Sequence, residues 1–160
     1  MLTVVPTPIG NLRDITLRAL DCLKEADLIV CEDTRQTRKL LDAYEIRKPM
    51  VSYHEHSGPG RAESILDEVR SGRSVALVSD GGTPLVSDPG FEIVHRAIGE
   101  GMRFEVLPGP AAFVTALVAS GLATDRFGFF GFPPVKSAAR RRFFAGLAGR
   151  EETLLFYESP

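Results

Sequence analysis

Short apolar runs alternate with longer amphipathic segments along this chain. The apolar runs cover residues 2–5, 28–31, 50–53, 75–79 and 104–107. Between them, apolar residues recur at spacings of three and four, which is the pattern of helices with one buried face. Strands that alternate with helices are typical of a parallel sheet. We therefore predict an α/β fold: an open, mostly parallel five-stranded sheet with helices on both faces.

The alternation starts again after residue 121. A phenylalanine-rich run at 127–132 is followed by a basic helical pattern and by another apolar run at 153–157. A single β-α-β unit buries too little apolar surface to form a domain. We therefore predict an N-terminal domain over residues 1–121, and we interpret residues 122–160 as a linker and the truncated start of a second α/β domain.

Four loops rich in glycine, proline and acidic residues follow predicted strands, at residues 6–14, 32–35, 80–90 and 108–111. Loops at the carboxyl ends of parallel strands meet at one edge of the sheet, where such folds bind ligands. Glycine lets a ligand approach the backbone, and free N–H groups at helix starts suit a carboxylate or phosphate. We predict a binding platform there, with Asp14 and Asp88 as helix caps. Neither the G-x-G-x-x-G nor the P-loop fingerprint is present.

Titratable side chains at this edge offer few routes to catalysis. Glu32 and Asp33 are adjacent carboxylates at a strand end, and either could act as a base. Alternatively, Asp33 or Thr34 simply caps the next helix. His54 and His56 lack a third ligand at a suitable spacing, so we expect no metal site.

The net charge of the chain is small, but its basic residues are unevenly distributed. The 160 residues are 44% apolar and 25% charged, with a net charge of −2. Arginine and lysine nevertheless concentrate in residues 34–48 and 136–150, either as polyanion-binding surfaces or as solvated helix faces. The two cysteines fall in apolar patterns, and no signal peptide or membrane-spanning run is evident. We therefore expect a soluble, cytoplasmic protein that does not bind membranes.

Five motifs occur in order along the chain: VPTPIGNLRDIT at 5–16, CEDTR at 31–35, SDGGTPLVSDPG at 79–90, PGPAA at 108–112 and YESP at 157–160. Through them the chain resembles the tetrapyrrole (corrin/porphyrin) methylase superfamily. Within it, the motifs are most similar to a branch that methylates a cytidine ribose 2′-hydroxyl of 16S rRNA. The resemblance implies a dimeric, two-domain enzyme dependent on S-adenosyl-L-methionine, with the small ribosomal subunit as partner.

The resemblance and the loop pattern together place the cofactor on three of the loops. Thr83 stands where tetrapyrrole methylases carry Asp, which counts against a tetrapyrrole substrate. Gly81 stands where the rRNA branch more often has Ala. The expected cofactor-binding residues are Pro8, Gly10, Asp80, Gly81, Gly82, Thr83, Pro84, Leu85, Ser87, Pro108, Gly109, Pro110 and Ala111.

The remaining expected site residues would bind the RNA or accept the proton of the reacting hydroxyl. Glu32 and Asp33 are the candidate catalytic residues, with Asp80 as a third available carboxylate. The candidate substrate-binding residues are Arg35, Arg38, His54, Arg140 and Arg141. Two alternatives stay open: methylation of a tetrapyrrole, and a non-catalytic fragment that binds nucleotides or RNA by stacking on its aromatic residues. We expect the 160 residues alone to be weak or inactive in catalysis.

Overall fold

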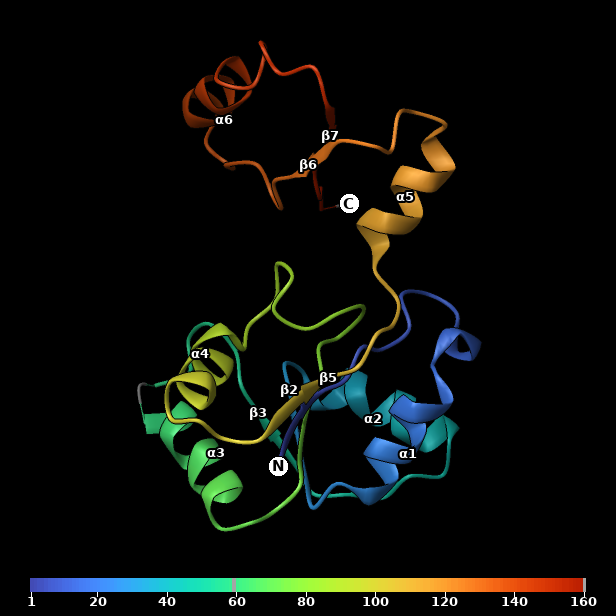
Figure 1. The fold of residues 1–160 in the computed structure, drawn as a ribbon, viewed down its shortest axis with the longest axis vertical. Coiled ribbons are helices and arrows are strands. Elements are labelled where there is room, and N and C mark those ends of the chain that lie inside the picture. Colours follow the sequence, from blue (N-terminus) through green and yellow to red (C-terminus); the bar gives the residue numbers. More distant parts are fainter. Residues whose placement is uncertain (59, 160) are drawn as a thin grey trace. The chain divides into compact units, whose positions relative to one another are not determined.

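The computed structural model describes residues 1–58 and 60–159, and the chain divides into two units at residues 110 and 111. The first unit contains nine regular elements and one short 3-10 helix, η1 (Figure 1). Their bounds are β1 Leu2–Val4, η1 Leu12–Asp14, α1 Leu17–Glu25, β2 Leu28–Cys31, α2 Thr34–Ala43, β3 Met50–Ser52, α3 Gly60–Arg70, β4 Val75–Leu77, α4 Phe91–Gly99 and β5 Phe104–Val106.

The strands of the first unit form one parallel sheet in the order β3-β2-β4-β1-β5. On β1, which lies between β4 and β5, Leu2 is opposite Val75 on β4 and Phe104 on β5. The predicted five-stranded sheet is therefore confirmed, and the pairing is parallel throughout.

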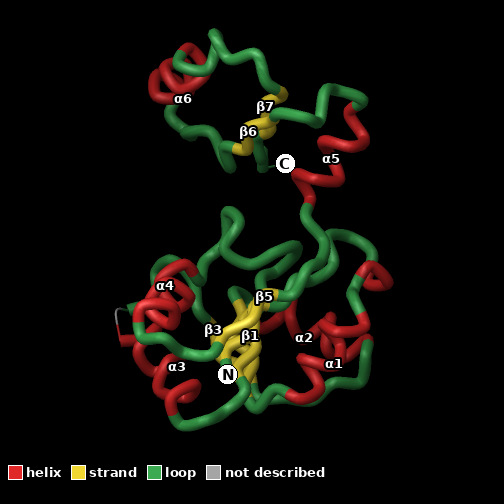
Figure 2. Tube along the Cα trace, viewed as in Figure 1, coloured by secondary structure: helices red, strands yellow, loops and turns green. Residues whose placement is uncertain are grey.

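Helices cover both faces of this sheet, as Figures 1 and 2 show. Val4 and Leu77 belong to a buried cluster with α3 and α4, whereas Ile29 and Ala76 belong to another with α1 and α2. Successive strand residues point to opposite faces, so β2 and β4 each contribute to both clusters. This explains why the strands appear in the sequence as continuous apolar runs.

Two predicted helix caps are wrong. The cap of α1 is Thr16, whose hydroxyl accepts a hydrogen bond from the Ala19 N–H at 3.1 Å, because Asp14 is taken up in η1. The cap position of α4 is Gly90, at a φ of 121°, without a side-chain hydrogen bond. Asp88 precedes that position by two residues, so its carboxylate does not take the capping place.

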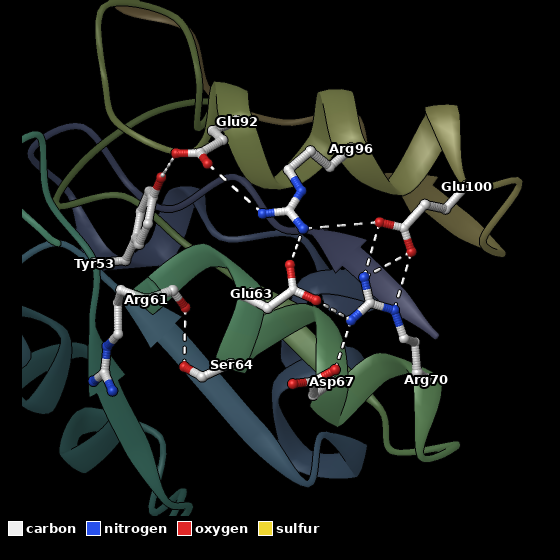
Figure 3. A network of polar contacts seen from close by, with 9 residues as sticks. All are labelled: Tyr53, Arg61, Glu63, Ser64, Asp67, Arg70, Glu92, Arg96 and Glu100. Carbon is white, nitrogen blue, oxygen red and sulfur yellow. Dashed lines mark hydrogen bonds and ion pairs between the residues drawn. The ribbon is translucent and has the colours of Figure 1, made fainter. Parts of the chain in front are cut away.

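An ion-pair network joins α3 to α4 (Figure 3). Arg70 of α3 contacts Glu63 at 2.5 Å and Glu100, the C-cap residue of α4, at 2.8 Å, while Arg96 of α4 pairs with Glu63. Tyr53, which follows β3, donates a hydrogen bond to Glu92 at 3.3 Å. The network therefore holds α4, the helix that directly follows the 80–90 loop.

The second unit consists of α5 Ala112–Ser120, β6 Phe127–Phe129, α6 Ser137–Ala145 and β7 Thr153–Leu155. β6 and β7 pair in parallel, as expected for a β-α-β unit. The sequence pattern assigned α5 to the first domain, whereas its contacts group it with the second unit. Phe113 of α5 stacks on Phe129 of β6 with ring centroids 4.6 Å apart.

Aromatic rings pack against one another throughout this second unit. Phe130 stacks on Phe156 at 5.6 Å, and Phe143 meets Phe156 edge-on at 5.9 Å. Packing of this kind supports the interpretation of these rings as internal contacts rather than as stacking platforms for bases. Pro160, the last residue of the YESP motif, lies outside the described residues.

Candidate functional site

The chain leaves the carboxyl ends of β1 and β4 toward opposite faces of the sheet. β1 is followed by α1 on one face, and β4 is followed by α4 on the other. The two strands are neighbours, so their loops diverge at a topological switch point. In open α/β sheets this is the place where ligands bind.

The loops after β1 and β4 are joined by an isolated bridge. Thr7 and Gly82 exchange two backbone hydrogen bonds of 2.9 Å each. The Thr7 hydroxyl also donates to the Ser79 carbonyl at 3.1 Å. These bonds fix the start of the 80–90 loop against the 6–14 loop.

The segment after β5 is tied to the same loop. The Thr83 hydroxyl donates to the Pro110 carbonyl at 3.0 Å. A Cβ at Gly109 would lie 2.5 Å from the Cβ of Pro6, so only glycine fits there without a shift of the backbone. The structure thus brings together the three predicted cofactor loops of the first unit.

The glycines of these loops offer what a polar cofactor needs. Gly81 and Gly109 are exposed, and within the described ranges their N–H groups donate to no other protein atom. Gly82 has a φ of 95°, in the left-handed region that favours glycine. Exposed, unpaired backbone donors without a Cβ fit the carboxylate, hydroxyls and heterocycle of S-adenosyl-L-methionine.

Backbone strain is concentrated further along the same loop. Leu85 and Ser87 have φ values of 72° and 64°, although neither is glycine. Such conformations cost about 1–3 kcal/mol each and cluster at ligand-binding segments. The strain therefore favours a functional role for the 80–90 loop.

The remaining predicted cofactor residues flank this constellation. Pro8 and Gly10 lie on the loop after β1, Pro84 is buried, and Pro108 is exposed just before Gly109. Ala111 belongs to the second unit, at the N-cap position of α5.

Asp33 is engaged in local structure. Its carboxylate caps α2 by accepting the Arg35 N–H at 2.8 Å, and it pairs with the Arg35 guanidinium at 2.6 Å. These hydrogen bonds from Arg35 lower the pKa of Asp33 to about 2. The capping interpretation is therefore confirmed, and a carboxylate so weakly basic is a poor proton acceptor at neutral pH.

Glu32 differs from its neighbour in both burial and pKa. Partial burial raises the pKa of Glu32, and the charges of Asp80 and Asp88 raise it further. Burial likewise raises the pKa of Asp88. The Asp33 N–H donates to Asp80 Oδ1 at 3.1 Å, which joins the loop after β2 to the loop after β4. Of the two candidate bases, Glu32 is thus the better suited.

The predicted substrate-binding residues fall into two groups. Arg35 and Arg38 are exposed on the first turns of α2, and His54 is exposed after the outermost strand, β3. Arg140 and Arg141 lie on α6 in the second unit, where Arg140 pairs with Glu158.

Among the described residues of the first unit, cavities open at two places of interest. One of about 210 Å³ lies beside the candidate loops, between residues 7–12, α2 and Ser79–Asp80. Its α2 wall carries Gln36 and Lys39, which the sequence analysis missed, although their place just after the β2 end was an available signal. The other, of about 260 Å³, is lined by α1 and the starts of β1 and β4, away from these loops.

Within residues 1–58 and 60–159 no three His, Cys, Asp or Glu side chains gather as metal ligands would. Nor does that part of the chain contain a helix with the length and apolarity to cross a membrane.

The fold, the switch-point loops and the sequence define a class of methyltransferase. Residues 1–160 match the tetrapyrrole (corrin/porphyrin) methylases, and the chain belongs to this family. Methyltransferases of this family use S-adenosyl-L-methionine. The predicted family and α/β fold are therefore confirmed.

Among curated relatives, the chain is similar to ribosomal RNA small subunit methyltransferase I. It is 50% identical to that protein from Halalkalibacterium halodurans over 99% of this chain and 55% of the relative. It is 48% identical to the Bacillus subtilis protein over 100% of this chain and 55% of the relative. The chain therefore spans about half the length of the curated relatives it matches.

Solved structures share the fold at lower identity. A diphthine synthase matches with a TM-score of 0.75 and 19% identity, over 99% of this chain and 65% of that one. A uroporphyrin-III-C-methyltransferase from Thermus thermophilus matches with a TM-score of 0.62 and 24% identity, over 84% of this chain and 64% of that one. These likenesses concern architecture alone.

Proposed function

We propose that this chain is part of a methyltransferase that transfers a methyl group from S-adenosyl-L-methionine to a cytidine ribose 2′-hydroxyl of 16S rRNA. The observation that carries the proposal is the joining of the loops after β1, β4 and β5 at the switch point. The identities of 48–50% to rRNA small subunit methyltransferases support RNA as the substrate.

The glycine-rich loops would hold the cofactor. Gly81 and Gly109 expose backbone donors, and the Thr83–Pro110 hydrogen bond keeps their two loops together. When bound, the cofactor supplies a methyl group already activated on a sulfonium. The chain's task is then mainly positioning, which can lower the barrier by about 7–11 kcal/mol for a well-aligned pair.

Glu32 is the residue we assign to the proton of the attacking hydroxyl. A ribose hydroxyl is a weak nucleophile, so a base that receives its proton assists the reaction. The raised pKa of Glu32 makes it more basic than Asp33, whose carboxylate is held by Arg35. Asp33 instead shapes the edge, through its cap and its bond to Asp80.

Arginines of α2 and α6 would bind RNA phosphates. Arg35 and Arg38 project from α2 beside the loop edge, and Arg140 and Arg141 add positive charge on α6. Phosphate contacts of this kind position an RNA without reading its sequence. An rRNA substrate is consistent with the expected cytoplasmic location. The motif resemblance implies a homodimer, which sedimentation of the purified protein would test.

Cofactor placement is tested by Gly82→Val, with Gly101→Val as the matched control. Both glycines have positive φ, at 95° and 65°, so both variants strain the backbone, but Gly101 lies between α4 and β5 at the opposite end of the sheet. Calorimetry with S-adenosyl-L-methionine should show weakened binding for Gly82→Val and normal binding for the control. Equal affinities in both variants would show that the cofactor binds elsewhere.

The reaction itself is tested with methyl-labelled cofactor and purified small ribosomal subunits. Label should appear at a ribose 2′-oxygen of 16S rRNA, located by nuclease digestion and mass spectrometry. Label on a base would contradict the proposed reaction.

A further inference from the structure

The cavity of about 210 Å³ beside the candidate loops has a mixed polar lining. Gln36, Thr37 and Lys39 of α2 contribute to its wall, together with Leu12 of the loop after β1 and Asp80 after β4. The cavity also borders Pro8 and Gly10, which the sequence assigned to the cofactor. Ligand pockets for drug-sized molecules are larger, at roughly 300–1,000 Å³. The cavity thus suits a single small ring rather than an entire nucleotide.

Its polar groups present both donors and an acceptor. Lys39 Nζ donates to Gln36 Oε1 at 2.8 Å, which orients the Gln36 amide and leaves its NH₂ group without a protein partner among the described residues. Asp80 accepts from the Asp33 N–H through Oδ1 alone, so Oδ2 is available to a donor on a ligand.

Thr37, which also lines the cavity, has an unusual buried hydroxyl. Thr37 is 4% exposed, and its Oγ1 is the one buried side-chain oxygen or nitrogen without a hydrogen-bond partner in the part of the chain that the structure describes. Thr37 lies close to the Cys31 thiol and lowers the pKa of that thiol, although burial raises this pKa by more. Sulfur is a weak hydrogen-bond acceptor, so the thiol satisfies the Thr37 hydroxyl poorly. A buried polar group left unpaired is costly, so it calls for an explanation.

We propose that this pocket takes one unstacked base of the RNA, that of the methylated nucleotide, an inference that rests on the proposed function. A phosphate would meet the Asp80 carboxylate, and a cation would meet Lys39. A neutral heterocycle with donors and acceptors on one edge satisfies both side chains. Proteins commonly recognise RNA by such splayed-out bases.

The place of the pocket supports this choice of nucleotide. Asp80 is shared between the pocket and the edge that carries Glu32, and it directly precedes the glycines assigned to the cofactor. A base bound against Asp80 therefore holds its own ribose next to the carboxylate that takes the proton. The pocket would determine which nucleotide reacts.

The test compares two RNA substrates: a small-subunit fragment with its target base intact, and the same fragment abasic at that nucleotide. We measure kcat/KM for methyl transfer by the protein, by Gln36→Ala, Lys39→Met and Thr37→Val, and by Lys24→Met, an exposed control on α1. The unmodified protein should prefer the intact RNA. Each pocket variant should lower that preference by about tenfold, the value of one hydrogen bond, whereas the control should leave it unchanged.

Calorimetry with S-adenosyl-L-methionine separates the possible outcomes. Affinity equal to that of the unmodified protein, with reduced preference for the intact RNA, supports the base pocket. An unaltered preference in all three pocket variants would overturn it, and a loss of cofactor affinity would assign the cavity to the cofactor instead. If the unmodified protein labels a base of either RNA instead of a ribose, the proposed function fails first.

Thr37→Val guards against a variant that merely misfolds. The change keeps the shape of the side chain and removes an unpaired buried hydroxyl, so the melting temperature should stay level or rise. A protein that is at least as stable yet distinguishes the two RNAs less well cannot be explained by damage to the fold.

Discussion

At the scale of single residues, two adjacent carboxylates of the same charge acquire opposite properties. Burial raises the pKa of Glu32, while hydrogen bonds from Arg35 hold the pKa of Asp33 at about 2. The two residues are neighbours in the chain, but their surroundings differ. Asp33 is the N-cap of α2, whereas Glu32 precedes the cap and lies near the charges of Asp80 and Asp88. Their expected roles differ accordingly, as a base and as a structural cap.

Substitution of Glu32 should therefore separate stability from activity. A raised pKa in the folded state means that ionisation of Glu32 opposes folding: its favourable contribution is present at low pH and is lost as pH rises through the folded pKa. Glu32→Gln should keep or raise the melting temperature at pH 7 while lowering kcat by roughly 10²–10⁴-fold. Circular-dichroism melts and single-turnover methyl transfer would check both effects.

Asp33→Asn is the matched comparison and should behave in the opposite way. Its lowered pKa stabilises the fold above the ordinary Asp value, and this stabilisation disappears as pH falls through about 2. Asparagine also caps helices but loses the ion pair with Arg35. Asp33→Asn should thus be less stable at pH 7 while keeping its chemical step; a kcat loss as large as that of Glu32→Gln would reverse the two assignments.

At the scale of elements, an ion-pair network joins α3 to α4, the helix that follows the 80–90 loop. The α3–α4 network in Figure 3 centres on Arg70 and Arg96, which share Glu63 and Glu100. Both arginine side chains are about one-third exposed, so solvent screens the network in part. Its effect is nevertheless shared among several contacts, which makes it stronger than an isolated surface pair.

Arg96→Met should lower the free energy of unfolding by about 1 kcal/mol, the upper range for exposed ion pairs. The difference from the unmodified protein should shrink in high salt, because salt weakens the pairs that the variant lacks. Urea unfolding at low and high ionic strength measures this, with the exposed Arg103→Met as control. A loss that is independent of salt would point to packing of the arginine stem instead.

The role of α2 in RNA binding is tested by Arg38→Ala. One lost phosphate contact should reduce the slope of log K against log salt by about one unit and weaken binding similarly for different RNA sequences. Filter binding of small-subunit RNA across a salt series gives the slope. As a control, Lys24→Ala removes an exposed charge from α1 and should leave the slope unchanged. Identical slopes for both variants would exclude Arg38 from the RNA interface.

At the scale of the whole molecule, the two units differ in the support that their sheets receive. The first has five paired strands covered by helices on both faces, whereas β6 and β7 form a two-stranded sheet within the described residues. Two-stranded sheets are marginally stable in water. Hydrogen exchange should therefore protect amides of β1 and β4 far longer than those of β6 and β7; equal protection would show one cooperative unit.

The length of the chain relative to its relatives bears on activity. It spans about half of the Bacillus subtilis protein. We expect the 160 residues to transfer methyl groups far more slowly than that complete relative at equal concentration. Similar rates would mean that residues 1–160 suffice for the reaction.

Three features could be predicted from the sequence: the succession of strands and helices along the chain, the family, and the loops that lie together at one edge of the sheet. They were predictable because apolar spacing and the positions of glycine and proline are local properties of the chain. The connection at residues 31–35 illustrates this: a cap was foreseen at Asp33, and Asp33 forms it. The caps at Asp14 and Asp88 were not correctly predicted, because Thr16 competes with Asp14 and the path of the 80–90 loop places Gly90 at the start of α4.

Only the tertiary structure determined the order of the strands within the sheet, the roles of the side chains at the carboxyl edge of the sheet, and the cavity beside α2. Sequence spacing does not reveal that β4 inserts between β1 and β2, and it is this insertion that brings Asp80 against Asp33 and Gly82 against Thr7. Burial and pKa depend on every element packed around a group, so the contrast between Glu32 and Asp33 is a property of the folded chain. The sequence determines which residues can do the chemistry, and the packing of distant segments determines which of them are placed to do it.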